Sequence, residues 1–259
     1  MPEWDSKKGS NVSQSVGSVA STRSSLKGST GTPSVPHYLS QVYWWAYVHP
    51  RAVKLFEREW LVNLILFGNY GRLRDQALAS MTDPVSRQVK GHTLQIACVY
   101  GNLTPRLVKR LAQDATLDVV DILPVQLSNL KAKLSSQDQA RLIQCDSAAL
   151  PQSDDSYDQT LLFFLLHEQP EEVRRATLSE ALRVTRPGGK LVIVDYHQPV
   201  KWHPLRPLMR LVFRKLEPFA MDLWRNEVLA YLPGKPAQFK ATKKTFFGGL
   251  YQVIELQKI

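Results

Sequence analysis

The chain has 259 residues, 44% of them hydrophobic and 22% charged, which is ordinary for a globular protein and enough to bury one sizeable core. Its formal net charge of +10 favours anionic partners such as nucleic acid, anionic lipid or a phosphorylated ligand. Two cysteines, Cys98 and Cys145, exclude a dense disulfide framework, and their places at or near the ends of apolar runs predict reduced, buried thiols.

No apolar stretch reaches the roughly 18 residues that a membrane-spanning helix needs. The run from Trp60 to Phe67 is too short and is interrupted by Asn63. No charged segment followed by an apolar one opens the chain, so a secretory signal is not expected. We therefore expect a cytoplasmic protein, with a place on the membrane surface left open.

Residues 1–36 are rich in Ser, Gly and Thr and hold almost no bulky apolar side chain. Such a segment cannot bury enough surface to offset the entropy lost on ordering, so we expect a disordered tail. Its shortage of acidic residues also suits an organellar transit peptide, which would place a eukaryotic protein in the mitochondrial matrix. A single arginine, Arg23, and the lack of an amphipathic period favour the tail, and residues 37–259 are expected to form one domain.

Helical patterns open that domain over residues 37–85. The stretch from Tyr38 to Phe67 is dense in aromatic residues with helical spacing, and the pair His49-Pro50 is expected to divide it into two helices. A third helix is predicted from Leu73 to Met81.

Alternating strands and helices follow over residues 90–200. The predicted strands are Thr93–Val99, Leu117–Ile122, Arg141–Cys145, Thr160–Leu166 and Lys190–Tyr196. Helices are predicted from near Thr104, over Pro124–Leu134 and over Glu171–Val184. This repetition predicts an α/β fold with a doubly wound, mostly parallel, Rossmann-like sheet. A helical segment over 204–232 and two terminal strands within 238–259, turning at Gly248-Gly249, complete the domain.

Two aspartates stand where the predicted strands end, at the sheet edge where open parallel sheets bind ligands. Asp121 closes the second strand, where a carboxylate can accept both hydroxyls of a nucleoside ribose; the alternative is that it caps the next helix. Asp146 follows the third strand, where it could hydrogen-bond an adenine amino group or simply begin a loop.

The order and spacing of these pieces resemble the menaquinone and ubiquinone C-methyltransferases, a class I family that uses S-adenosylmethionine (SAM). The segments Cys145–Asp158 and Leu182–Ile193 carry the likeness, which spans about residues 90–200. The resemblance implies a class I SAM-methyltransferase fold, here with an N-terminal helical extension. It also implies a set of residues around SAM, namely Val99, Tyr100, Gly101, Asn102, Asp121, Ile122, Asp146, Ser147 and Ala148.

One part of the chain departs from that family. The family's first motif has an acid on the first strand and three glycines in the following turn, whereas here Gln95 replaces the acid and Ala97 and Val99 replace two glycines. Only Gly101 is kept, and Tyr100 adds bulk. Because those glycines let the backbone approach the methionyl end of SAM, we expect that end of the site to be rebuilt.

That departure, together with three further segments, closely resembles the RquA family of rhodoquinone biosynthesis. The segments are Tyr43–Arg51, Phe67–Asp75 and Phe246–Tyr251, and the likeness covers about residues 37–257. The resemblance implies conversion of ubiquinone to rhodoquinone, in which an amino group replaces a ring methoxy group. It further implies that SAM is the amino donor and that manganese(II) assists. A refilled turn that displaces the methionyl arm is one way to bring the SAM nitrogen to the ring.

The polar residues at the substrate end are expected to be His167, Tyr196 and His197, with Tyr196 or His167 polarising a quinone carbonyl. Manganese prefers carboxylate, carbonyl, water and sometimes imidazole, and His167, Glu168, Asp195 and His197 stand at strand ends. They form no spaced ligand motif, so the sequence identifies no metal site. A His167 that closes the pocket without a metal is an equal alternative.

A ubiquinone tail lies in the bilayer, so the resemblance implies a peripheral enzyme on the inner membrane face. A helix from Leu205 to Leu216 has the character for this. Its apolar face would hold Leu205, Leu208, Met209, Val212 and Leu216, and its basic face Arg206, Arg210 and Arg214. The aromatic cluster from Tyr43 to Tyr47 is a second candidate for the interface. For both segments the alternative is packing on the domain core.

Two other functions stay open: a SAM-dependent methyltransferase acting on a quinone or small molecule, and a non-catalytic methyltransferase fold that serves as a binding partner. The altered glycine turn argues against the first, and the retained Asp121 and Asp146 argue against the second. No nucleic-acid recognition motif of known type accompanies the positive charge, so nucleic acid is not an expected partner.

Overall fold

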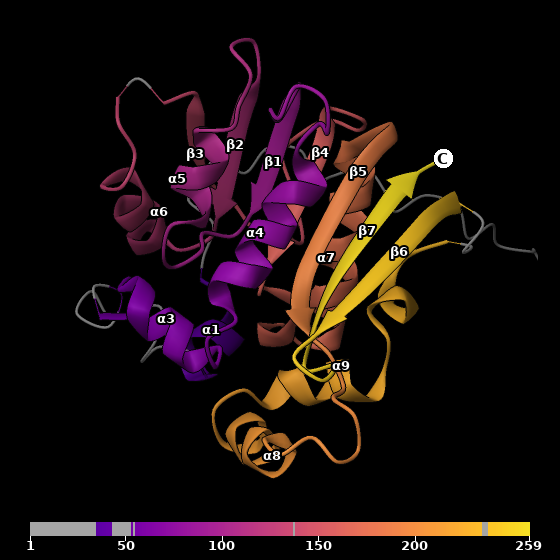
Figure 1. Cartoon of the computed structure of the whole chain (residues 1–259). Helices are drawn as coiled ribbons and strands as arrows, with labels where there is room; N and C mark the ends of the chain where they lie inside the picture. The colour runs from indigo at the N-terminus through magenta and orange to yellow at the C-terminus, as the bar shows by residue number, and fades with distance from the viewer. Residues whose placement is uncertain (1–34, 43–52, 54, 137, 235–237) are drawn as a thin grey trace, which may run out of the picture. The chain divides into compact units, whose positions relative to one another are not determined.

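The structure of the protein is a computed structural model that describes residues 35–42, 53, 55–136, 138–234 and 238–259 (Figure 1). The chain divides into the units Met1–Gly31 and Thr32–Ile259, and every described residue belongs to the second unit. The expected tail up to residue 34, the aromatic cluster from Tyr43 to Tyr47 and the helix break at His49-Pro50 therefore lie outside the described residues.

Within the described residues, seven strands form one sheet in the order β3-β2-β1-β4-β5-β7-β6. They are β1 (His92–Ile96), β2 (Thr116–Asp121), β3 (Ala140–Gln144), β4 (Tyr157–Phe163), β5 (Thr185–Tyr196), β6 (Phe239–Phe246) and β7 (Tyr251–Lys258). The first five run parallel to their neighbours, whereas β7 is antiparallel to β5 and β6 is antiparallel to β7. The predicted doubly wound, mostly parallel sheet is confirmed.

The strands β2 and β4 bury apolar side chains on both faces, which allows helices to cover both sides of the sheet. Val119 and Leu161 belong to one buried apolar cluster, whereas their chain neighbours Val120 and Leu162 belong to another. The first cluster includes side chains of α4 (Tyr70–Met81), α5 (Leu103–Val108) and α8 (Arg206–Lys215), and the second includes side chains of α7 (Glu171–Val184). The core is therefore two layers separated by the sheet.

The remaining helical elements are short. They are α1 (His37–Val42), α3 (Glu59–Ile65), α6 (Pro124–Lys131), α9 (Asp222–Arg225) and the 3₁₀ turns η2 (Leu166–Glu168), η3 (Pro218–Met221) and η4 (Val228–Tyr231). None of the described helices is long and apolar enough to cross a membrane. Both cysteines are free, Cys145 buried and Cys98 half-buried.

Two strands end three residues earlier than the sequence predicts, whereas β2 and β3 each end one residue earlier. The predicted strand Thr93–Val99 stops at Ile96, because Ala97 takes a left-handed conformation with φ of 73°. The predicted strand Thr160–Leu166 stops at Phe163, because Phe164 has φ of 53°. A strand cannot continue through a residue in the left-handed conformation. Residues other than glycine that adopt this conformation are concentrated at functional sites.

The sequence Pro187-Gly188-Gly189, which precedes the predicted strand Lys190–Tyr196, lies inside β5. The pairing of β4 with β5 jumps from Tyr157 with Thr185 to Gln159 with Lys190, so the intervening residues bulge out of the ladder. The expected turn at Gly248-Gly249 is present between β6 and β7, with positive φ at both residues.

Candidate functional site

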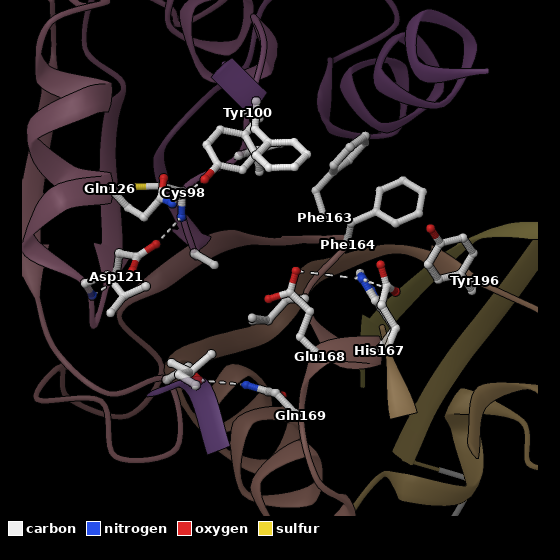
Figure 2. A pocket seen from close by; sticks show the side chains of 18 of the residues that line it. Cys98, Tyr100, Asp121, Gln126, Phe163, Phe164, His167, Glu168, Gln169 and Tyr196 are labelled. Atoms are coloured by element: carbon white, nitrogen blue, oxygen red, sulfur yellow. Dashed lines mark hydrogen bonds and ion pairs between the residues drawn. The ribbon is translucent and has the colours of Figure 1, made fainter. Parts of the chain in front are cut away.

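A cavity of about 460 Å³ lies beyond the carboxyl ends of the parallel strands. Residues at or after the ends of β1 to β5 line it, and α1, α3 and α8 contribute its other walls. Open parallel sheets bind their ligands at this edge, because the loops that follow the strands meet there. Figure 2 shows polar side chains at two ends of this cavity, around Asp121 and around His167.

Asp121 is the last residue of β2 and lines one end of the cavity. Its two carboxylate oxygens accept the backbone N–H groups of Cys98 and Leu123, each at 2.8 Å. The side chain of Cys98 and the backbone of Ile122 also hydrogen-bond this carboxyl, which faces the cavity. Because cavity walls enclose the carboxyl, burial raises the pKa of Asp121 to about 6, so the group is ionised at neutral pH.

Asp146 and Ser147 follow β3 and line the same end of the cavity, together with Ile122. One Asp146 oxygen accepts the N–H of Ala148 at 2.8 Å, which fixes the start of the loop. Ala148 itself is not among the lining residues. The structure therefore brings Asp121, Ile122, Asp146 and Ser147 together around one end of the cavity.

The loop after β1 is held from one side by Tyr70 of α4. The Tyr70 hydroxyl accepts the N–H groups of Asn102 and Leu103 at 2.9 and 3.1 Å and donates to the carbonyl of Tyr100 at 3.2 Å. Gly101 has φ of 80°, and a Cβ there would lie 2.6 Å from the Tyr70 hydroxyl oxygen. The N–H groups where an anionic ligand could meet this loop are thus already bound by a protein side chain.

Glu57 and Lys133 hold the same loop from the other side. Glu57 Oε1 accepts the N–H of Gly101 at 3.2 Å and the ammonium of Lys133 at 2.8 Å. Lys133 also donates to the carbonyls of Val99 and Gly101, at 3.2 and 2.9 Å. We call Glu57, Tyr70 and Lys133 the loop clamp. Motif reasoning missed all three, because their partners lie far away in the sequence.

Only some of the loop residues that were predicted to contact SAM line the cavity. Val99 and Tyr100 line it, whereas Gly101 and Asn102 do not. Tyr100 stacks on Phe56 with ring centroids 6.0 Å apart, and its hydroxyl accepts Gln126 Nε2 at 2.8 Å. The expectation of a rebuilt turn thus has a concrete form: bulky side chains face the cavity, and the loop backbone is bound by the protein.

Aromatic rings form the wall at the other end of the cavity. The ring of Phe164 lies 5.1 Å from that of Phe163 and 5.4 Å from that of Tyr196, in edge-to-face contacts. The His167 ring lies 4.8 Å from the Tyr196 ring. Burial raises the pKa of Tyr196 well above its ordinary value, so its phenol stays protonated. A flat, apolar ring fits such a wall.

His167 is buried between carboxylates in this wall. Its Nδ1 donates to Asp195 Oδ1 at 2.9 Å, and its Nε2 lies 3.3 Å from Glu217 Oε2 and 3.7 Å from Glu168 Oε1. Burial alone would lower the pKa of His167, but the charges of Asp195 and Glu217 outweigh it and raise the pKa to about 9. The imidazole is therefore charged at neutral pH.

Glu217 follows α8 and lines the cavity beside His167. Burial raises the pKa of its carboxyl, while the charge of His167 opposes that effect. Its Oε2 forms no hydrogen bond with any described group. Sequence reasoning missed Glu217, because nothing in its own segment shows that the chain returns to His167.

His197 does not line the cavity. Its Nδ1 donates to the carbonyl of Gly249 at 2.8 Å, and its Nε2 lies 3.5 Å from Glu227 and from Lys243. The structure therefore brings His167 and Tyr196 together at the cavity and places His197 at the turn between β6 and β7.

The described residues do not fit manganese. No three His, Cys, Asp or Glu side chains among them are grouped so that they could hold a metal ion. The carboxylate of Asp195 accepts the N–H groups of Leu166, His167 and Tyr196 as well as the imidazole, so its oxygens are directed at the protein. His167 uses both ring nitrogens on carboxylates, which leaves no converging set of donors.

The sequence is similar to those of known methyltransferases. Residues 93–189 match the family described as methyltransferase domain. The chain is 27% identical over 170 residues to demethylmenaquinone methyltransferase of Bacillus licheniformis, covering 65% of this chain and 70% of the relative. The enzyme of the same name from Lactiplantibacillus plantarum is 26% identical over 173 residues, with the same coverage. The chain is thus related to demethylmenaquinone methyltransferases.

Solved structures show the same fold. An O-methyltransferase family protein from Burkholderia thailandensis superposes with a TM-score of 0.58 at 13% identity, covering 80% of this chain and 60% of that chain. The N-methyltransferase NodS from Bradyrhizobium japonicum, in complex with S-adenosyl-L-homocysteine, gives a TM-score of 0.54 at 12% identity, covering 80% and 97%. The fold is that of the class I SAM-dependent methyltransferases.

The close approach of Gly101 and Tyr70 generates a prediction about stability. Gly101→Ala should reduce the free energy of unfolding by about 1–3 kcal/mol, because the new methyl group overlaps the Tyr70 hydroxyl and the backbone is left-handed. Gly71→Ala is the matched control, since its Cβ would meet only Arg74 at 3.7 Å, and it should stabilise α4 by about 1 kcal/mol. Chemical denaturation measures both. Equal effects of the two substitutions would contradict the contact.

Proposed function

We propose that this protein is a SAM-dependent methyltransferase whose acceptor is a quinone-type ring in its reduced form. The observation that carries the proposal is one cavity that joins an ionised aspartate, Asp121, at the nucleoside end to an aromatic wall with a charged His167 at the other. The class I fold and the relation to demethylmenaquinone methyltransferases support it.

Asp121 and Asp146 would hold the nucleoside of SAM. Asp121, whose carboxylate lines the cavity, would accept the two ribose hydroxyls, and Asp146 would accept the adenine amino group. Ile122 and Leu123 provide an apolar wall for the base. SAM supplies an electrophilic methyl group to a nucleophile placed opposite it.

The other end of the cavity would bind the acceptor ring and accept the proton that the ring loses. Phe163, Phe164 and Tyr196 provide an apolar wall on which the ring can pack. The charged His167 would stabilise negative charge on a ring oxygen, which makes the ring carbon a better nucleophile. As the carbon–methyl bond forms, the proton on that carbon must leave, and Glu217 is an acceptor with a raised pKa within the same cavity.

A second candidate is the exchange of a ubiquinone methoxy group for an amino group, with SAM as the amino donor. The loop clamp favours it. Because Glu57 and Tyr70 occupy the N–H groups of Gly101, Asn102 and Leu103, those groups are closed to the carboxylate of a methionyl arm. An arm displaced from the loop could turn its α-nitrogen, instead of its methyl group, toward the ring.

Isotope labelling separates the two reactions. The purified protein is given SAM labelled with heavy carbon in the methyl group and heavy nitrogen in the α-amino group, with demethylmenaquinol or ubiquinone as acceptor. Mass spectrometry of the extracted quinone is expected to show the carbon label. If the quinone carried only the nitrogen label, the reaction would be the amino exchange and not methyl transfer. SAM binding with neither label in the quinone would refute both reactions and leave a non-catalytic SAM-binding fold.

The pKa of Asp121 predicts how nucleoside binding depends on pH. Affinity for S-adenosyl-L-homocysteine should weaken as the pH falls below about 6, because a protonated carboxyl no longer accepts two hydroxyls. Asp121→Asn should bind roughly ten- to a hundredfold more weakly and without this pH dependence. Calorimetric titration measures both. Asp138→Asn, in the turn before β3, is the control, and an inflection that survives in Asp121→Asn would assign it to another group.

The pKa of His167 predicts how turnover depends on pH. The charged form is complete below the ordinary value of 6.5 and is lost as the pH rises through about 9, so kcat should fall above pH 9. His167→Gln should lower kcat by about two to four orders of magnitude and remove this alkaline limb. His92→Gln, at the exposed start of β1, is the control and should retain it. An unchanged limb in His167→Gln would exclude His167 as its source.

A further inference from the structure

Two helices that flank the cavity expose apolar side chains beside it. Both α3 and α8 lie beyond the carboxyl ends of the parallel strands (Figure 1). The exposed side chains are Trp60, Leu64 and Ile65 of α3 and Leu208, Leu211 and Leu216 of or next to α8. We call these six residues the apolar rim. Trp60 is 60% exposed and Leu211 57%, which is far from core packing.

The core does not need the rim residues of α8. Met209 and Phe213 of this helix are buried, and the Phe213 ring packs on Tyr196 at 4.9 Å and on Trp224 at 5.1 Å. The apolar face expected from the sequence is therefore divided. Met209 packs on the domain as the core alternative requires, whereas Leu208 stays exposed.

The apolar wall of the cavity continues into this surface. Ile65 and Leu216 both line the cavity and are exposed, at 42% and 45%. They stand on opposite elements, one ending α3 and the other following α8. At each of these two residues the apolar lining of the cavity is also exposed apolar surface, which the hydrocarbon chain of a ligand could follow.

The charge on the α8 side of the rim is positive. The helix α8 carries Arg206, Arg210, Arg214 and Lys215 and no acid. Arg210, Arg214 and Lys215 form no ion pair with any described residue. On the loop before this helix, Trp202 is 85% exposed. Unpaired basic groups next to exposed Trp and Leu are the combination that binds an anionic lipid interface.

We propose that the apolar rim and the basic residues of α8 dock the protein on an anionic phospholipid bilayer, with the cavity opening toward the lipid. Trp60, Leu64, Leu208 and Leu211 enter the interfacial layer, and the arginines contact lipid phosphates. The cavity then receives a ring whose hydrocarbon tail stays in the membrane. This last step rests on the proposed function, whereas the docking itself does not.

Co-sedimentation with vesicles tests the docking. The full chain should bind vesicles of phosphatidylcholine mixed with phosphatidylglycerol. It should bind vesicles of pure phosphatidylcholine only weakly, and its binding to the mixed vesicles should weaken at high salt concentration. Leu208→Ser with Leu211→Ser should reduce the partition coefficient by about tenfold or more, because two apolar side chains no longer enter the lipid. Arg210→Gln with Arg214→Gln should reduce it by about tenfold on the anionic vesicles only.

Matched controls lie at the amino ends of the strands, away from the cavity. Val85 is 89% exposed in the loop before β1, so Val85→Ser removes an exposed apolar side chain of a similar kind. Lys90→Gln with Lys240→Gln removes two positive charges from the same end. The controls should bind vesicles like the unaltered protein. Absence of binding by the unaltered protein, or equal losses in controls and rim variants, would overturn the proposal.

Failure of docking and failure of the proposed reaction give different results. Leu208 and Leu211 do not line the cavity, so their double variant should keep its affinity for S-adenosyl-L-homocysteine and its turnover of a short-tailed, water-soluble quinol. Its turnover of a long-tailed quinol in vesicles should fall with vesicle binding. If the unaltered protein did not bind S-adenosyl-L-homocysteine, the proposed function would be refuted, whereas the result of the vesicle experiment would still hold.

Discussion

The carboxylate of Asp195 is the group on which the acceptor end of the site depends. Asp195 is fully buried at the end of β5, and it accepts three backbone N–H groups, those of Leu166, His167 and Tyr196. It thereby fixes the 3₁₀ turn after β4 against the neighbouring strand and orients the imidazole of His167 through Nδ1. A buried charge is tolerated only when it is bound this fully, so the sheet edge and the histidine are set by one interaction.

A second constraint acts on the loop after β1, where Ala97 and Val99 stand in place of two of the three glycines of the resembled family and only Gly101 is kept. Ala97 takes the left-handed conformation that a glycine would adopt with less strain, and Gln95 holds it there by donating to its carbonyl at 2.9 Å. The loop clamp then binds the N–H groups of Gly101, Asn102 and Leu103 and the carbonyls of the residues before them. The segments that carry Glu57 and Tyr70 therefore shape the candidate site, since both side chains bind N–H groups of this loop.

Local sequence patterns predicted the helices and strands of this protein well. The contacts that shape the candidate site join residues far apart in the sequence and could not be predicted in this way. The helix Glu171–Val184 was predictable to the residue, because helical period and its flanking proline are properties of one segment. Asp121 was predictable as a strand-ending acid, since the apolar run before it stops there. The clamp was not, because Glu57 and Tyr70 bind groups 44 and 32 residues away. The early ends of β1 and β4 follow from left-handed residues, which no propensity assigns to alanine or phenylalanine.

The helix α8 joins the chemistry of the cavity to its outer surface. One side of the helix packs Met209 and Phe213 on the core, and another exposes Leu208 and Leu211. Glu217 follows directly after this helix, and its carboxylate lies 3.3 Å from His167. Because the charge of Glu217 helps to raise the pKa of His167, any shift of the helix relative to the sheet changes how firmly the imidazole holds its proton. A partner that bound the exposed side of α8 and moved the helix would therefore change, through one carboxylate, the charge of His167.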